Sequence, residues 1–301
     1  MARVFVITNP VAARTNPDDR RAVERIFKAS GWRVEGALTQ QPGDARRLAA
    51  EALDLGADIV VAFGGDGTTM QAAAALVGTD VALGLVPGGT GNVLAGNLRI
   101  PSAPVPAAQL IARGHSRRID LGRLERDDGI HYFAVAAGAG ADAEIMGGTQ
   151  THLKRQWGIG GYFATLFRTL ASIRTSPYRI TIDGETVEML ASDALVLNCG
   201  EMIPPLVRAI REAQPDDGIL DLIVLAADTP YQCVRGILRA MQNVWFETGP
   251  TPYLMYGRGH EITIETEIVL PVQYDGEVAG TTPVTAVVVP GALRVVSDGI
   301  R

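Results

Sequence analysis

The stretch GGDGT at 64–68 places one carboxylate, Asp66, among three glycines directly after the apolar run 58–64. Glycines at a strand end let backbone N–H groups approach an anion, and the start of a following helix adds positive potential. A carboxylate among phosphates needs a divalent cation between them, so the combination indicates binding of a metal–nucleotide complex. The alternative is a plain turn in which Asp66 caps the next helix.

Three other stretches also combine turn residues with polar groups. PGGTGN at 87–92 follows another apolar run, and two such loops on neighbouring parallel strands face the same crevice. QPDDGILDL at 214–222 clusters carboxylates, which suits a hard divalent cation but also an acidic surface turn. VQYDGEV at 272–278 predicts a hairpin with Glu277 at the start of the next strand, where a general base could be held. Asp-Gly hairpins are frequent, so this motif alone favours a plain hairpin turn.

The elements that must position the two glycine loops follow from the alternating pattern of the first hundred residues. Apolar runs predict strands at 3–8, 32–39, 58–64 and 81–87. Amphipathic stretches between them predict helices, the first opened by Asn16-Pro17. This order predicts an α/β domain with a parallel sheet and helices on both faces, and ligands bind beyond the carboxyl ends of such strands.

From Arg118 onward, strand patterns dominate the sequence. They are separated by turn pairs such as Asp183-Gly184 and Asp275-Gly276. We therefore expect a second domain that is an antiparallel β-sandwich. Two helical stretches, 153–174 and 231–247, interrupt the strands.

Composition narrows the class of protein. The chain has 301 residues, 47% of them hydrophobic and 20% charged, as is ordinary for a globular protein. Cys199 and Cys233 have no metal-ligand spacing, which fits buried thiols in a reducing compartment. There is no signal peptide pattern and no apolar run long enough to span a bilayer, so we expect a soluble, cytoplasmic protein. A net charge of −6 argues against nucleic acid as the main partner.

Taken in order, the motifs resemble those of the diacylglycerol kinase catalytic-domain superfamily, in its bacterial lipid-kinase branch, which is also similar to sphingosine kinases. The matching motifs are Asn9-Pro10, Thr39 with GDA at 43–45, GGDGT at 64–68, PGGTGN at 87–92, IDLG at 119–122, GAGADAEI at 138–145, PDDGILD at 215–221 and DGE at 275–277. The resemblance implies an ATP-binding α/β domain at 1–117, rejoined by residues 291–301, and a β-sandwich domain at 118–290 that takes the lipid acceptor.

The resemblance also implies roles for single residues. The positions that resemble ATP contacts are Asn9, Thr39, Gly64, Gly65, Asp66, Gly67, Thr68, Gln71, Gly89, Thr90 and Asn92. Asp66 resembles the acid that positions the phosphates and Mg²⁺, and Asp120 an acid that lines the cleft between the domains. Asp217, with the carbonyl groups of Gln214 and Ile219, resembles a structural Mg²⁺ site, and Glu277 resembles the general base. The implied cofactors are ATP and Mg²⁺, and the implied acceptor is a hydroxyl of a diacylglycerol-like or sphingoid lipid.

A lipid acceptor implies contact with a membrane. Residues 151–180 contain no acid, and their cations are interleaved with aromatic and aliphatic side chains; the cations are Lys154, Arg155, Arg168, Arg174 and Arg179. We therefore expect the basic amphipathic stretch 153–174 to dock peripherally on anionic lipid. The alternative is a helix that packs its apolar side on the sandwich and leaves its basic side in water.

Three positions depart from the family pattern. Met70-Gln71 stands where Asn-Glu is usual, Val93 where an acid often follows PGGTGN, and the segment VAARTN after Pro10 lacks the usual glycine. Two other functions therefore stay open: an NAD kinase-like enzyme, whose relatives share GGDGT, and a non-catalytic protein that binds nucleotide or lipid. The sequence carries no signal for the oligomeric state or for the identity of the acceptor.

Overall fold

The structure, a computed structural model, describes residues 1–126, 129–140, 175–203, 207–210, 212–236, 238 and 252–298. Contacts divide the chain into two units, one made of residues 1–120, 203–205 and 290–301, the other of residues 121–202 and 206–289. The predicted fold class is confirmed, because the first unit holds a parallel sheet with helices and the second holds antiparallel sheets. The helix predicted at 153–174 lies outside the described residues.

The sheet of the first unit is built on five strands that pair in parallel. Its strands, in spatial order, are β2 (Arg33–Leu38), β1 (Arg3–Thr8), β3 (Ile59–Gly64), β4 (Ala82–Pro87) and the end of β18 (Val284–Val296). β3 and β4 are buried along their whole length, as expected for central strands that are covered on both faces. The last residues of β18 pair with β4 at Val295 and Leu83.

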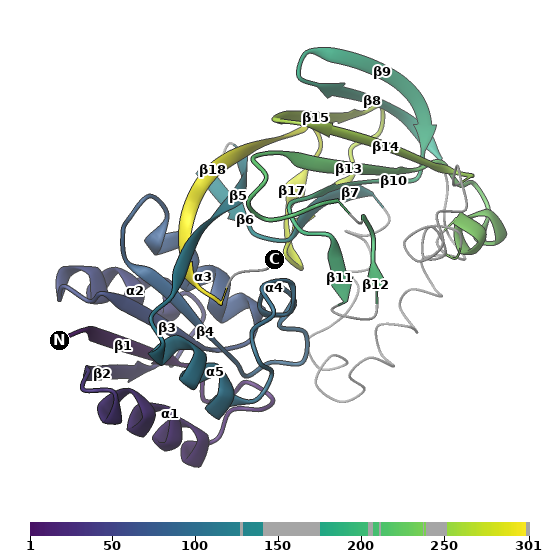
Figure 1. Cartoon of the computed structure of the whole chain (residues 1–301). Coiled ribbons are helices and arrows are strands. Elements are labelled where there is room, and N and C mark those ends of the chain that lie inside the picture. The colour runs from purple at the N-terminus through teal and green to yellow at the C-terminus, as the bar shows by residue number, and fades with distance from the viewer. Residues whose placement is uncertain are drawn as a thin grey trace. The chain divides into compact units, whose positions relative to one another are not determined.

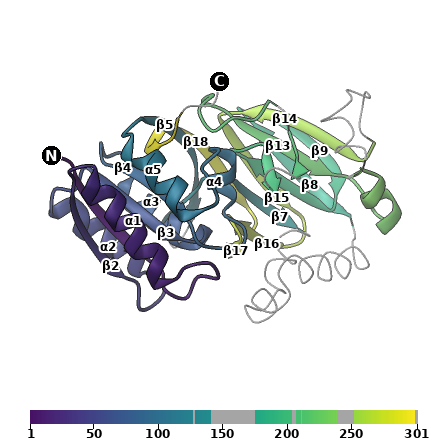
Figure 2. The same ribbon diagram turned by 60° about the horizontal axis from the view of Figure 1, so that its bottom comes forward.

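Five helices cover this sheet. They are α1 (Pro17–Ala29), α2 (Asp44–Asp54), α3 (Asp66–Leu76), α4 (Val93–Asn97) and α5 (Pro104–Ala112). Helices α1 and α5 pack together on one face of the sheet, and α2 and α3 pack together on the other (Figure 1). Figure 2 shows α1 and α5 side by side. α1 begins where predicted, since the Asn16 side chain accepts the Asp19 N–H at 2.8 Å and Pro17 occupies the first turn.

The second unit contains two antiparallel sheets. One contains β5 (Ser116–Arg126), β6 (Gly129–Phe133), the start of β18, β15 (Glu261–Thr266), β8 (Ser176–Ile182) and β9 (Glu185–Ala191). The other contains β14 (Leu254–Gly259), β13 (Leu220–Leu225), β10 (Asp193–Leu197), β7 (Ala136–Gly140), β16 (Pro271–Tyr274) and β17 (Glu277–Thr281). Two short strands, β11 (Glu201–Ile203) and β12 (Val207–Arg208), pair with each other in a separate sheet. Alternate residues of these strands form one core, for example Ile180, Leu222 and Ile264.

Both Asp-Gly pairs singled out in the sequence form tight hairpin turns. The φ angles are 49° and 90° at Asp183 and Gly184, and 44° and 84° at Asp275 and Gly276. Left-handed angles at both central residues match the right-handed twist of the flanking strands, which is why Asp-Gly is favoured there. Within the described part of the chain, no helix is long and apolar enough to cross a membrane.

Candidate functional site

Asn9, Gly65 and Gly88 directly follow the neighbouring strands β1, β3 and β4, so their loops meet at the carboxyl edge of the sheet. The Asn9 N–H donates to the Phe63 carbonyl at 2.9 Å, and its side-chain amide donates to the Thr68 hydroxyl at 3.1 Å. The Gly88 N–H donates to the Gly64 carbonyl at 2.7 Å. These bonds extend the strand pairing into the loops and fix the loop backbones relative to one another.

The two glycine loops touch backbone to backbone. A Cβ atom at Gly89 would lie 2.7 Å from the Gly65 Cα, and one at Gly64 would lie 2.6 Å from the Thr68 hydroxyl oxygen. Any side chain at Gly89 would therefore push the loops apart. The glycines permit this close approach, which brings two sets of loop N–H groups to the same edge.

Asp66 ties the second loop to the first. Its Oδ2 accepts the Asn92 N–H at 2.7 Å and its Oδ1 accepts the Val93 N–H at 2.6 Å. Burial raises the pKa of Asp66 above its ordinary value, and the hydrogen bonds from Val93 and Asn92 oppose that rise. A Cβ at Gly91 would lie 2.7 Å from Oδ2, so the loop also needs a glycine beside the carboxylate. Asp66 is thus a structural clamp as well as the predicted ligand of phosphate and metal.

Asn92 closes its own loop. Its Oδ1 accepts the Gly89 N–H at 2.9 Å and its Nδ2 donates to the Gly89 carbonyl at 2.8 Å. Asn92 has a φ of 49°, a conformation that asparagine tolerates better than most residues. Thr90, at the tip of this closed loop, is exposed, and so is Gly67 in the other loop. Gln71 is half-buried in α3.

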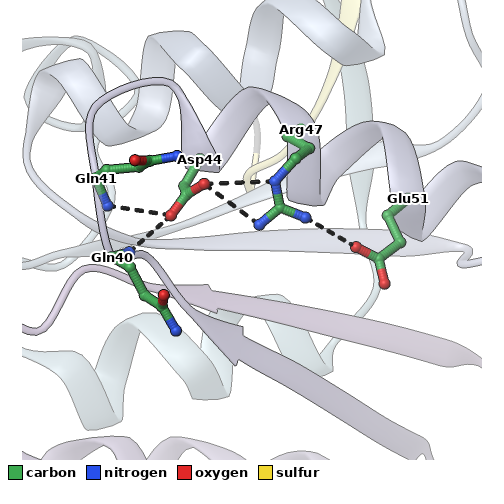
Figure 3. Close-up of polar contacts among 5 residues, drawn as sticks. All are labelled: Gln40, Gln41, Asp44, Arg47 and Glu51. Carbon is green, nitrogen blue, oxygen red and sulfur yellow. Dashed lines mark hydrogen bonds and ion pairs between the residues drawn. The ribbon is translucent and has the colours of Figure 1, made fainter.

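The loop after β2 carries Thr39 and is held by a separate network (Figure 3). The Thr39 N–H donates to the Thr8 carbonyl at 2.9 Å. Beyond it, Oδ2 of Asp44 accepts the Gln40 N–H at 2.8 Å, and Oδ1 faces the Arg47 guanidinium at 3.3 Å. The Gln40 hydrogen bond lowers the pKa of Asp44, although burial opposes the shift. The GDA stretch therefore supports the loop that follows Thr39, through a charged and anchored Asp44.

Two hydroxyl groups that the sequence did not single out lie in segments next to these loops. The Oγ1 atoms of Thr8, at the end of β1, and of Thr15 are buried and have no hydrogen-bond partner among the residues that the structure describes. The Arg14 N–H donates to the Gly88 carbonyl at 2.8 Å, and a Cβ at Gly88 would lie 2.5 Å from the Thr15 Oγ1. Buried hydroxyls usually have partners, so these two could donate to an anion at the loops. In the sequence, the one sign of such a role is that Thr15 lies shortly after the Asn9-Pro10 motif.

These features fit the phosphates of a nucleotide. The exposed Thr90 and the two buried hydroxyls are suitable donors to an anion. Loop N–H groups can add to them, except those of Gly88, Gly89, Asn92 and Val93, which already donate within the protein. The fit for Mg²⁺ is looser, because both oxygens of Asp66 already accept N–H groups. Mg²⁺ keeps several waters when proteins bind it, so Asp66 suits contact through water better than direct coordination.

Asp120, predicted to act with Asp66 toward Mg²⁺, lies in β5 and is buried. Its Oδ1 accepts the Gly291 N–H at 2.7 Å, where Gly291 has a φ of 59°. This bond joins β5 to β18 within the first unit. The structure thus gives Asp120 a backbone partner, and its predicted role toward Mg²⁺ stays a prediction.

In the second unit, Glu277 is exposed and opens β17, opposite Tyr274 of β16. The turn before it is fixed by Asp275, whose carboxylate accepts three N–H groups. The donors are Ala134 at 2.7 Å, Val135 at 2.9 Å and Ala136 at 3.0 Å. The turn thus presents Glu277 on a rigid hairpin, as a general base requires. The sequence indicated the turn but not the partners of Asp275.

The acidic turn before β13 contains a cation supplied by the protein itself. Arg258 donates to Oδ2 of Asp217 at 2.8 Å and pairs with Oδ1 of Asp221 at 2.8 Å. Burial raises the pKa of Asp221 to about 6, although Arg258 opposes the shift. The other Asp217 oxygen accepts the Ile219 N–H at 3.2 Å, and Gln214 is exposed.

A Mg²⁺ ion at this turn would share Asp217 with the Arg258 guanidinium, which already neutralises that carboxylate. No group of three or more His, Cys, Asp or Glu side chains within the described ranges is arranged to hold a metal. The structural Mg²⁺ site at Gln214, Asp217 and Ile219 therefore stays a prediction, and no step of the reaction below depends on it.

Comparison with known proteins shows the family to which the chain belongs. Residues 3–124 match the family model of the diacylglycerol kinase catalytic domain, and residues 134–297 match that of the YegS C-terminal NAD kinase beta sandwich-like domain. A "Probable lipid kinase YegS-like" from Chromohalobacter salexigens is 32% identical over 300 residues, covering 96% of this chain and 91% of the relative. A "Diacylglycerol kinase" from Mycobacterium tuberculosis is 28% identical over 307 residues, covering 98% and 95%.

The same group appears among solved structures. The crystal structure of a "putative diacylglycerol kinase" from Bacillus anthracis superimposes with a TM-score of 0.82 at 26% identity, covering 98% of this chain and 97% of that one. The chain belongs to the diacylglycerol kinase catalytic-domain superfamily, with a sandwich domain of the YegS type in its second half.

Proposed function

We propose that this protein is a lipid kinase that transfers the γ-phosphoryl group of ATP to a hydroxyl of a diacylglycerol-like or sphingoid lipid. The enzyme class rests on the family and on relatives that are named lipid kinase and diacylglycerol kinase. The observation that supports a nucleotide donor is the pair of glycine loops that touch at Gly65 and Gly89 and are clamped by Asp66. Such loops offer N–H groups to phosphates.

The proposed reaction is a direct displacement at the γ-phosphorus. Glu277 takes the proton of the acceptor hydroxyl as its oxygen bonds to phosphorus, and the bond from phosphorus to the β–γ bridging oxygen breaks to release ADP. N–H groups of both loops stabilise the charge on the transferred group. Asn9, Thr39, Gln71 and the two loops would hold ATP. Mg²⁺, held by Asp66 through water and by Asp120, would supply charge neutralisation at the phosphates.

We assign ATP binding to residues 1–117 together with 291–301, and lipid binding to residues 118–290. The protein would act in the cytoplasm and reach its acceptor at the membrane surface. Five cations and no acid in 151–180 support contact of the stretch 153–174 with anionic lipid, and this stretch lies outside the described residues.

The test is incubation with labelled ATP, Mg²⁺ and a total lipid extract, followed by identification of the labelled product. We expect one phosphorylated lipid, and a fall of at least about 100-fold in its formation for Asp66→Asn. Asp54→Asn is the matched control, because Asp54 is an exposed aspartate at the end of α2. It should retain the activity of the unaltered protein.

Two outcomes would favour the other functions. Labelled NADP from NAD, with no labelled lipid, would identify an NAD kinase-like enzyme. ATP binding without any labelled product would identify a non-catalytic binding protein. That second candidate is favoured by one observation: Val93 stands where the family often has an acid, and its N–H occupies an oxygen of Asp66.

A further inference from the structure

A helix after β13 has one face that lies exposed among the residues that the structure describes. Residues 230–236 and 238 are helical. The helix starts at Thr229, whose hydroxyl accepts the Gln232 N–H at 3.3 Å and whose carbonyl accepts the Cys233 N–H at 3.1 Å. Pro230 follows this cap, at the position where proline costs no hydrogen bond. The helix is therefore a well-initiated element of the second unit.

Cys233 and Gly236 attach the helix to the sheet beneath it. Cys233 is buried with Ala227, and Leu225 and Tyr253 pack against that pair. A Cβ at Gly236 would lie 3.4 Å from the Pro252 carbonyl oxygen, so the helix backbone lies close to the backbone at Pro252. These contacts define the inward face of the helix.

The outward face is apolar. The exposed fractions are 70% for Tyr231, 41% for Val234 and 55% for Leu238, which lie three and four residues apart. At about 100° per residue, these side chains and the exposed Arg235 fall within an arc of about 100°. Cys233 and Gly236 point the opposite way on the same geometry. The large exposed side chains thus form one stripe, which is the pattern of a helix that needs a second partner.

We propose that this stripe, formed by Tyr231, Val234 and Leu238, inserts into the surface of an anionic lipid bilayer. The segment 229–246 contains Arg235 and Arg239 and no acid, although the chain as a whole carries a charge of −6. An apolar face with an aromatic side chain, flanked by arginine, is the composition of helices that lie in a bilayer interface. Arg235 on the rim of the stripe would meet lipid phosphates.

A second copy of the chain fits this surface less well. Symmetric pairing of the stripe would bring two copies of Arg235 toward each other. The stripe also offers three large apolar side chains, whereas a stable dimer uses about 20 to 30 residues a side. The choice of lipid rests on the proposed function, since a lipid acceptor resides in a bilayer. The inference adds a docking surface separate from the stretch 153–174.

The experiment measures co-sedimentation of the full chain with vesicles of phosphatidylcholine and phosphatidylglycerol in equal parts. The variant Val234→Glu/Leu238→Glu should bind at least about tenfold more weakly, because it places charges where apolar side chains would be buried. Val269→Glu is the matched control, since Val269 is 71% exposed in the loop between β15 and β16. It should bind like the unaltered protein, and all three proteins should melt at similar temperatures.

Unchanged binding of the double variant would overturn the proposal. So would a dimer in light scattering that the double variant abolishes without loss of vesicle binding, because the stripe would then be a contact between copies. A second arm compares transfer to acceptor in vesicles with transfer to a water-soluble short-chain diacylglycerol. The double variant should lose the first activity and keep the second. If the unaltered protein phosphorylates no lipid of the total extract, the proposed function is refuted, while its vesicle binding still tests the stripe.

Discussion

The tripeptide Asp-Gly-Glu occurs twice in the second unit, at 183–185 and at 275–277. In both copies the aspartate and the glycine have left-handed φ angles, and the glutamate opens the next strand. In both, the aspartate carboxylate accepts N–H groups from a neighbouring segment. In both places the tripeptide thus forms a hairpin turn and anchors it to another segment of the chain.

The segments to which the two turns are anchored differ. Asp275 accepts three N–H groups from residues 134–136, which lead into the family motif at 138–145. Asp183 accepts N–H groups from His260 and from Glu261 at the start of β15, and its side chain is 43% exposed. Identical local sequence therefore does not distinguish a candidate general base from a surface glutamate. The two turns differ in their partner segments, and the role of Glu277 as general base stays a prediction.

The largest expected effect is a loss of kcat, and we expect it at Glu277 but not at Glu185. Glu277→Gln should lower kcat by about 10²–10⁴-fold, because the amide cannot accept the proton of the acceptor hydroxyl. ATP affinity and melting temperature should stay unchanged, since the exposed amide keeps the shape of the carboxylate. Glu185→Gln, the same change in the other hairpin, should behave like the unaltered protein. Steady-state kinetics with the lipid found above and calorimetry with ATP check both variants. Equal losses in the two would show that position 277 has no special role.

A smaller effect should separate the two aspartates. Asp275→Asn should reduce the free energy of unfolding by about 1–3 kcal/mol, because all three N–H groups lose a charged acceptor and at least one of them then faces the amide NH₂. Asp183→Asn should reduce it less, because water reaches that turn. Urea unfolding measures both. A greater loss at Asp183 would mean that the number of N–H partners does not determine the strength of the anchor.

The smallest effects concern pH. The Glu261 N–H lowers the pKa of Asp183, so this carboxylate adds stability above its unfolded pKa of 3.8 that is lost as pH falls through the lower folded value. Asp221 has the opposite sign: burial raises its pKa from 3.8 to about 6, so the folded state holds the extra proton and loses stability as pH rises between those values. In a plot of the free energy of unfolding against pH, Asp183→Asn should reduce the loss of stability at acid pH. Asp221→Asn should reduce the decline between about pH 4 and 6. Unaltered profiles would contradict these assignments.

Local chemistry explains which features could be predicted. The parallel sheet, the sandwich and both Asp-Gly turns follow from patterns within a few residues, and the structure confirms them. The partners of Asp275 lie 139 to 141 residues away, and Arg258 lies 41 residues from Asp217. Such pairs depend on strand register and not on local sequence. The roles of Asp66, Asp120 and Glu277 remain predictions, because hydrogen bonds in the protein alone do not reveal a reaction.

Strand β18 has a consequence for how the chain is made. It pairs with β15 through residues 284–287 and with β4 through Val295. Synthesis proceeds from the N-terminus, so the sheet of the first unit lacks its last strand until Val295 has left the ribosome. Until then β4 presents an unpaired edge, the kind of surface that chaperones protect. A nascent chain stalled before residue 290 should therefore bind chaperones at its first unit, although nearly all of that unit has already been synthesised.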